Sequence, residues 1–319
     1  MKTKPFFRFL LKLSLVCSVF VTLGVQGSMA QKNKSSDEDT LGAYTKIEVK
    51  PSVTDNRITA YDLPHVVFYD PKIKNNKVLL WLFGTSGTTD GMPFKFLKTA
   101  VNQGYRVVVL SYITEPAVAG VCIGKTLASD KGCPVEYRRK RAYGDNNFSL
   151  IPDQPQDAII SRFVKLLAYL AKSDATGQWA QYLDAQGAKP NWSRIAVAGQ
   201  SQGGGMAEFI GQNENIFRVI SFSGGWDYSD AKTKKIAGWY YNSNVTPMAN
   251  WYATYNVKER ATKSISEICV ALKIPADHVF ALDKPLLSTN SSSDNPYHGD
   301  GVHNPAYKQV WLTMLGSGL

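Results

Sequence analysis

Several features that would point to other classes of protein are absent from this chain of 319 residues. It has no block of basic residues and no alternation of basic with aromatic residues, which argues against nucleic acid as a partner. Its longest uncharged apolar run is too short to span a bilayer comfortably. The sequence contains no internal repeat and no boundary between two domains. It has only four histidines, which leaves few candidates for a catalytic base.

The first 30 residues have the pattern of a signal peptide. Four basic residues lie among the first twelve, the run 13–25 is apolar and uncharged, and the small residues Ser28 and Ala30 follow. These are the features that direct export and cleavage by a signal peptidase. We therefore expect a secreted or periplasmic protein, cleaved near Ala30, that keeps no stable membrane anchor.

The mature chain is predicted to consist of a flexible leader, 31–43, and a single domain, 44–319. The leader begins with polar and charged residues that are typical of disorder. Loss of the four basic residues of the signal peptide lowers the formal charge from +10 to +6. A mature length of about 290 residues suits one large domain with an ample core.

Three cysteines remain after the predicted cleavage. Cys122 and Cys133 enclose a short polar segment, and an oxidising compartment favours a disulfide between them. Cys269 lies in an amphipathic helical pattern with no histidine or lysine accompanying it, so we expect a buried free thiol.

Apolar strands and amphipathic helices alternate along the chain. The segment 77–83 is almost continuously apolar, as in a parallel strand that is covered on both faces. Further strands are expected at 105–112, 194–198, 217–222, 251–255 and 279–282. Helices are expected at 94–102, 157–172, 261–272 and 304–315. This alternation predicts an α/β fold with a mostly parallel sheet and helices on both faces.

A Gly-x-Ser-x-Gly motif, Gly199-Gln200-Ser201-Gln202-Gly203, follows the strand expected at 194–198 and precedes a segment that can begin a helix. Strand, tight turn and helix are the context of a nucleophile elbow. The turn strains the backbone of the serine, so small neighbours are required. We predict Ser201 as the nucleophile; a flexible glycine loop is the alternative.

The serine requires a base, and the base requires an acid that orients it. In proteins with such an elbow, the acid and then the histidine follow the serine along the chain. His298 and His303 lie in the predicted loop before the last helix, and we favour His298 because the adjacent glycines leave the ring free to move over the serine. Glu259, after the strand at 251–255, is the predicted acid, and Asp227 is the alternative.

Acyl transfer also requires backbone N–H groups that face the oxyanion. Gln202, directly after the nucleophile, is expected to supply one. Thr85 or Ser86, in the small-residue loop after the strand at 77–83, is expected to supply the other; an ordinary turn is the alternative. No metal or other cofactor is predicted, because the two histidines and Asp300 lack a further clear ligand.

Together these motifs resemble secreted bacterial serine hydrolases of the α/β-hydrolase superfamily, of the esterase- or lipase-like kind. The resemblance extends from about residue 60 to the C-terminus and depends on Gly84-Thr85-Ser86-Gly87, Trp192-Ser193-Arg194, the elbow with Gly204, and Val310-Trp311. It implies an α/β-hydrolase fold, Ser201 as nucleophile, a base near His298 and an acid near Glu259. The sequence departs from the pattern at Gln200, where histidine is frequent, and at the acid, which is more often Asp.

The sequence thus predicts a serine hydrolase that cleaves carboxylic esters of small molecules through an acyl-enzyme on Ser201, with short-chain or aryl esters as first choice. The aromatic residues near 226–228 and 239–241 either line an acyl pocket or form a packed cluster. Lipase, polyester depolymerase and serine peptidase are alternatives on the same triad. A non-catalytic secreted binding protein is the alternative outside enzymes.

Overall fold

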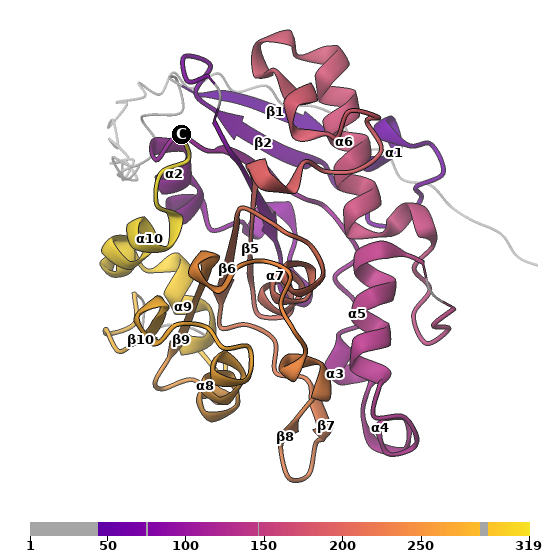
Figure 1. The fold of residues 1–319 in the computed structure, drawn as a ribbon, viewed down its shortest axis with the longest axis vertical. Helices are drawn as coiled ribbons and strands as arrows, with labels where there is room; N and C mark the ends of the chain where they lie inside the picture. The colour runs from indigo at the N-terminus through magenta and orange to yellow at the C-terminus, as the bar shows by residue number, and fades with distance from the viewer. Residues whose placement is uncertain (1–43, 75, 146, 288–292) are drawn as a thin grey trace, which may run out of the picture. The chain divides into compact units, whose positions relative to one another are not determined.

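The computed structural model describes residues 44–74, 76–145, 147–287 and 293–319. Figure 1 draws these residues in colour. The predicted signal peptide, 1–30, and the predicted leader, 31–43, lie outside the described residues. In the described part of the chain, no helix is long and apolar enough to cross a membrane.

An eight-stranded sheet forms the centre of the structure. Its strands are β1 (Thr45–Val49), β2 (His65–Tyr69), β3 (Val78–Leu82), β4 (Arg106–Val109), β5 (Ile195–Gln200), β6 (Arg218–Phe222), β9 (Trp251–Asn256) and β10 (Val279–Leu282). They lie in the order β1-β2-β4-β3-β5-β6-β9-β10. Strand β2 is antiparallel to both of its neighbours, whereas every other pair is parallel. The predicted mostly parallel sheet is confirmed.

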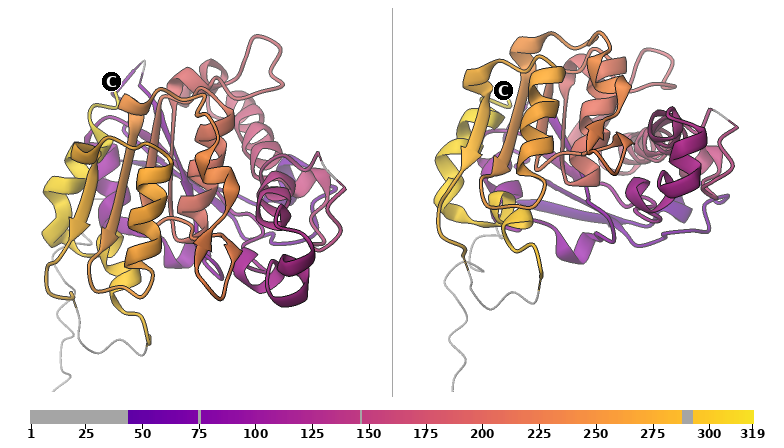
Figure 2. Two further views of the ribbon diagram at one scale, coloured as in Figure 1. Left: turned by 60° about the horizontal axis from the view of Figure 1, so that its bottom comes forward. Right: turned by 90° about the horizontal axis from the view of Figure 1, so that it is seen from below.

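Helices cover both faces of this sheet, as Figure 2 shows. On one face α2 (Phe94–Asn102) packs against α10 (Lys308–Leu315). On the other lie α6 (Ile159–Ser173), α7 (Gln202–Asn213) and α8 (Thr262–Ala271), and the one-turn α1 (Pro51–Thr54) contacts α6. Strands β3 and β4 are buried at every position, because a parallel strand in such a fold has no face in water.

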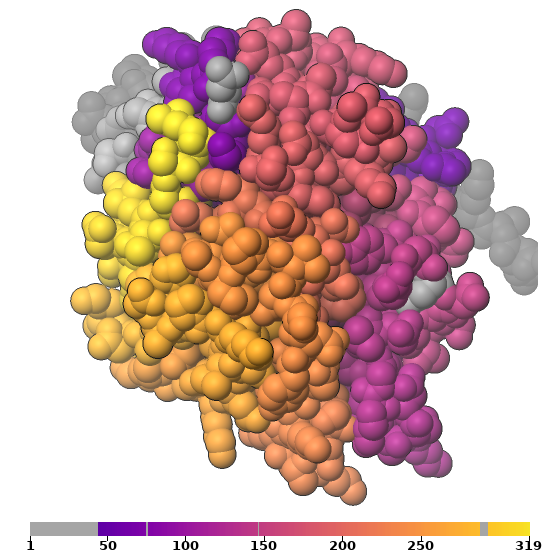
Figure 3. Space-filling view, in the orientation of Figure 1, coloured from indigo at the N-terminus to yellow at the C-terminus, as the bar shows by residue number. Residues whose placement is uncertain are grey.

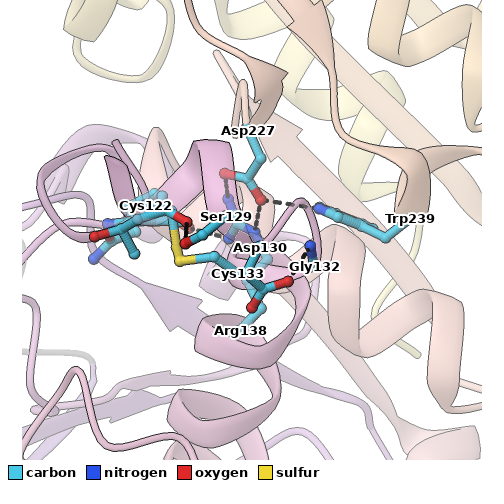
Figure 4. Close-up of a disulfide and its surroundings, with 11 residues drawn as sticks. Cys122, Ser129, Asp130, Gly132, Cys133, Arg138, Asp227 and Trp239 are labelled. Carbon is cyan, nitrogen blue, oxygen red and sulfur yellow. Dashed lines mark hydrogen bonds and ion pairs between the residues drawn. A yellow bond between two sulfur atoms is a disulfide. The ribbon is translucent and has the colours of Figure 1, made fainter. Parts of the chain in front are cut away.

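One region has more structure than the sequence pattern indicates. Between β4 and α6 the chain forms α3 (Val118–Val121), α4 (Gly124–Ser129) and α5 (Cys133–Tyr143). The predicted disulfide joins Cys122, at the end of α3, to Cys133, at the start of α5, with the two Cα atoms 5.6 Å apart (Figure 4). Helix α5 has no apolar periodicity because two of its inward-facing residues, Arg138 and Arg141, are buried in ion pairs.

Two further segments differ from the expectations. A two-stranded hairpin, β7 (Tyr228–Asp230) and β8 (Lys235–Ile236), follows β6. The segment predicted as a loop around His298 is instead the helix α9 (Tyr297–His303). Of the two glycines of α9, Gly301 allows close packing, because a Cβ atom there would lie 2.7 Å from Leu282 Cδ1. Cys269 is a buried free cysteine, as predicted.

Candidate active site

Ser201 lies at a sharp turn between β5 and α7, with φ 56° and ψ −123°. A non-glycine residue rarely adopts a positive φ, and this strain is typical of functional turns. A Cβ atom at Gly203 would lie 2.2 Å from the carbonyl oxygen of Leu82, and one at Gly199 would lie 2.3 Å from the backbone of Gly203. The motif glycines are therefore required by the close approach of α7 to β3, and the predicted strand–turn–helix context is present.

His298 and Glu259 are joined by a hydrogen bond. The Nδ1 atom of His298 lies 2.7 Å from Oε2 of Glu259, and since a carboxylate accepts, the ring nitrogen donates. The other carboxylate oxygen accepts from the backbone N–H of Asn256 at 2.8 Å and from the hydroxyl of Ser223 at 2.9 Å. The side chain of Glu259 is fully buried. This arrangement holds the imidazole with its Nε2 atom available as a proton acceptor.

The alternative acid, Asp227, and the alternative base, His303, lie in surroundings that differ from those of Glu259 and His298. Both carboxylate oxygens of Asp227 accept hydrogen bonds from the guanidinium of Arg138, and the Trp239 indole N–H donates to the same carboxylate at 3.0 Å. Figure 4 shows this cluster. Both members of the ion pair are fully buried. His303 is exposed on the last turn of α9, and no described carboxylate accepts a hydrogen bond from its ring.

Several contacts bring His298 close to Ser201. The side-chain N–H of Gln200, the residue before the serine, donates to the backbone oxygen of His298 at 3.1 Å. The ring of Trp226 packs edge-on against the ring of His298, with 5.0 Å between the centroids. Among the described residues, no hydrogen bond joins the hydroxyl of Ser201 to His298. Catalytic hydrogen bonds are often long without substrate and shorten in the Michaelis complex.

The loop after β3 also lies against Ser201. A Cβ atom at Gly84 would lie 3.0 Å from Cβ of Ser201, so this loop approaches Ser201 closely. Thr85 lines the same cavity as Ser201 and Gln202. Ser86 has φ 60°, and its hydroxyl donates to the side chain of Glu115. The N–H of Gln202 is at the first position of α7, where a helix has no internal partner for it.

The side chain of Gln202 has a role that the sequence did not indicate. Its amide oxygen accepts from the backbone N–H of Val118 at 3.0 Å and from the hydroxyl of Tyr137 at 3.2 Å. Its amide nitrogen donates to the backbone oxygen of Thr114 at 2.9 Å. Gln202 thus ties the start of α7 to α3 and α5. These partners are more than 60 positions away in sequence, and no local pattern indicates them.

A cavity of about 190 Å³, here called the Ser201 cavity, opens beside Ser201. It is lined by Thr85 of the loop after β3, by residues of α3 and the disulfide within 117–123, by Trp226 ahead of the hairpin, and by Tyr228 at the start of β7. The α3–α5 region and the hairpin, which both supply lining residues, lie beside each other in Figures 1 and 3. The aromatic residues near 226–228 and those near 239–241 therefore lie in different places. Trp226 and Tyr228 line the cavity, whereas Trp239 and Tyr240 are packed in the core.

Within the described residues, no group of three or more His, Cys, Asp or Glu side chains is arranged to hold a metal ion. His65 is fully buried, accepts from the backbone N–H of Ser111 at 2.9 Å, and has its pKa lowered to about 3 by burial. Burial likewise raises the pKa of the Cys269 thiol. Both groups are therefore uncharged at neutral pH and lie in the interior.

No model of a protein family matches the chain, and no curated protein matches its sequence. Among solved structures, it is similar to a putative dienelactone hydrolase from Klebsiella pneumoniae, with 11% identity, a TM-score of 0.44, and coverage of 86% of this chain and 98% of that one. An S-formylglutathione hydrolase from Staphylococcus aureus matches with 12% identity, a TM-score of 0.45, and coverage of 86% and 97%. Esterase B from Lactobacillus rhamnosis matches with 11% identity, a TM-score of 0.46, and coverage of 86% and 84%.

A mostly parallel eight-stranded sheet, an antiparallel second strand and a serine at a strained turn after β5 define the fold. The fold is that of the α/β-hydrolases, as the sequence motifs predicted.

Proposed function

We propose that this protein is a secreted serine hydrolase that cleaves carboxylic esters of small molecules. The observation that carries the proposal is the hydrogen bond of 2.7 Å between His298 Nδ1 and the buried carboxylate of Glu259, close to a serine in a strained turn. A hydroxyl becomes an effective nucleophile only when a base takes its proton. An oriented imidazole beside a serine hydroxyl is the arrangement that this reaction requires.

In the proposed reaction, Ser201 Oγ attacks the ester carbonyl carbon while Nε2 of His298 takes the hydroxyl proton. Glu259 holds the ring and stabilises the imidazolium that forms. The oxyanion accepts hydrogen bonds from the backbone N–H of Gln202 and from that of Thr85, which we choose over Ser86 because Thr85 lines the cavity. The bond to the alcohol oxygen then breaks, and His298 gives the proton to this oxygen. Water then attacks the acyl carbon while His298 takes its proton; the bond from this carbon to Ser201 Oγ breaks, the acid is released, and His298 returns the proton to Oγ.

The first test is hydrolysis of p-nitrophenyl esters by the wild type and by Ser201→Ala, together with labelling by a fluorophosphonate. We expect the substitution to lower kcat by about 10⁶-fold and to abolish labelling. Equal rates for both proteins and no label on Ser201 would reject the proposal and favour a binding protein that keeps the fold. A panel of peptides and long-chain lipids separates an esterase from a peptidase or a lipase.

The second test concerns the base. His298→Ala is expected to abolish turnover, whereas His303→Ala, on the exposed last turn of α9, is expected to retain it. The reverse result would assign the base to His303. Circular dichroism of both variants checks that α9 is still folded.

Export forms part of the proposal. The disulfide between Cys122 and Cys133 is compatible with an oxidising compartment. Expression of the full chain in a bacterial host, followed by N-terminal sequencing of the exported protein, should give a start near Gln31. Retention of the intact chain in the cytoplasm would contradict this.

A further inference from the structure

His298 does not line the Ser201 cavity. It lines a separate hollow together with Gln200, whereas Ser201, Gln202 and Thr85 line the cavity. During acyl transfer the histidine protonates the leaving alcohol, so the alcohol has to lie beside His298. The acyl group then extends from the carbonyl toward the Ser201 cavity.

The size of the cavity limits the acyl group. Its 190 Å³ is below the roughly 300–1,000 Å³ of most small-molecule sites. An apolar cavity of about 150 Å³ is enough to hold benzene. The Ser201 cavity therefore has room for one aromatic ring or a short acyl chain.

The charge of the cavity walls limits the acyl group further. In the described part of the chain, Arg138 and Asp227 are the only charged side chains that line the cavity, and the two are joined by a bidentate ion pair. The guanidinium is therefore not free to receive an anion. A carboxylate on the acyl group would lose its hydration and gain no cationic partner, which is strongly unfavourable.

We propose that the Ser201 cavity is the acyl-binding subsite of this enzyme and that it selects a short, uncharged acyl chain or a single aromatic ring. The proposal depends on the ester hydrolysis proposed above. It also assigns a selective role to the wall formed by α3 and the disulfide, because residues within 117–123 line the cavity.

The test compares kcat/KM for p-nitrophenyl acetate, butyrate, benzoate, decanoate and hemisuccinate, a series in which only the acyl group changes. Butyrate and benzoate are expected to be the best substrates. Decanoate and hemisuccinate are expected to be at least about tenfold poorer than butyrate, since even one misplaced methylene changes kcat/KM by about that factor. Equal rates for decanoate, hemisuccinate and butyrate would overturn the proposal.

A pair of matched variants tests whether the selectivity comes from the cavity or from another part of the surface. Ala117 is half-buried and lines the cavity, whereas Ala128 is exposed on α4 and does not. Ala117→Leu is expected to lower the ratio of butyrate to acetate hydrolysis by about tenfold or more, and Ala128→Leu is expected to leave it unchanged. Thermal unfolding verifies that both variants are folded.

Two different failures are distinguishable. If Ser201 reacts with the fluorophosphonate but Ala117→Leu has the same butyrate-to-acetate ratio as the wild type, the subsite is wrong and the hydrolase stands. If no ester is cleaved and Ser201 is not labelled, the proposed function itself fails, and the subsite with it.

Discussion

Replacement of Glu259 by glutamine tests the proposed triad most sharply, because the surroundings of this side chain determine how the amide must lie. One carboxylate oxygen accepts from the backbone N–H of Asn256 at 2.8 Å. A backbone N–H can only donate, so the amide oxygen of the introduced glutamine has to remain at this position. The NH₂ group then faces Nδ1 of His298, which lies 2.7 Å from the second oxygen in the wild type.

An amide donor at this position reverses the role of the imidazole. Nδ1 has to accept, so the ring proton moves to Nε2, and the ring can no longer take the proton of Ser201. A wrong tautomer of this kind costs about 10⁴-fold in kcat in a serine hydrolase, or about 5.4 kcal/mol of transition-state stabilisation. The number of hydrogen bonds around the side chain is unchanged, so we expect little change in Tm.

The assay is single-turnover and steady-state hydrolysis of p-nitrophenyl butyrate, with Ser223→Ala as control. This control removes the hydroxyl that donates to Glu259 at 2.9 Å but leaves the carboxylate and its bond to His298. We expect the control to lose about 1.5–3 kcal/mol of stability, as for a hydrogen bond to a charged group, and little of kcat. A folded Glu259→Gln variant with kcat within tenfold of the wild type would refute the assignment of Glu259 as the orienting acid.

Three further predictions concern stability. Gly203→Ala should abolish activity and lower Tm in thermal unfolding, because its Cβ would lie 2.2 Å from the carbonyl oxygen of Leu82; Gly120→Ala, with no atom within 4 Å of its Cβ, should do neither. Cys122→Ser removes a disulfide with a sequence separation of 11 and should cost about 3 kcal/mol in urea unfolding; an unchanged midpoint would contradict this. Burial raises the pKa of Glu208 from 4.5 to about 8. Only the unfolded carboxyl ionises between these values, so stability should fall as pH rises through this window, and Glu208→Gln should remove that dependence.

The elements that local pattern specifies were predictable from the sequence. Strand β3 is apolar at each position, α2 has the predicted bounds, and the elbow stands between a strand and a helix. The helix α5 was not predictable, because its inward face carries Arg138 and Arg141 rather than apolar residues. Those charges can be buried because each forms an ion pair, Arg138 with Asp227 and Arg141 with Asp153.

Helix α9 was missed for a related reason. Its sequence contains two glycines and two histidines, and glycine disfavours a helix interior by about 1 kcal/mol. Tertiary contacts outweigh this preference: the Trp311 indole N–H donates to the backbone oxygen of Gly301 at 2.8 Å, and Gly301 packs on Leu282. His298 is thus held on a packed helix, and its approach to the serine depends on contacts made far along the chain.

The pairing of Arg138 with Asp227 explains why a reasonable candidate acid has another role. A Cβ atom at Gly205 would lie 2.5 Å from the guanidinium of Arg138, and one at Gly225 would lie 2.4 Å from it. These glycines therefore make room for the arginine, which joins α5 to the first turn of α7 and to the loop after β6. A buried ion pair is weak evidence for stability, but this one fixes the loop whose Trp226 packs against the ring of His298. The acid that orients the histidine and the acid that positions its aromatic neighbour are thus different residues, and only the fold distinguishes them.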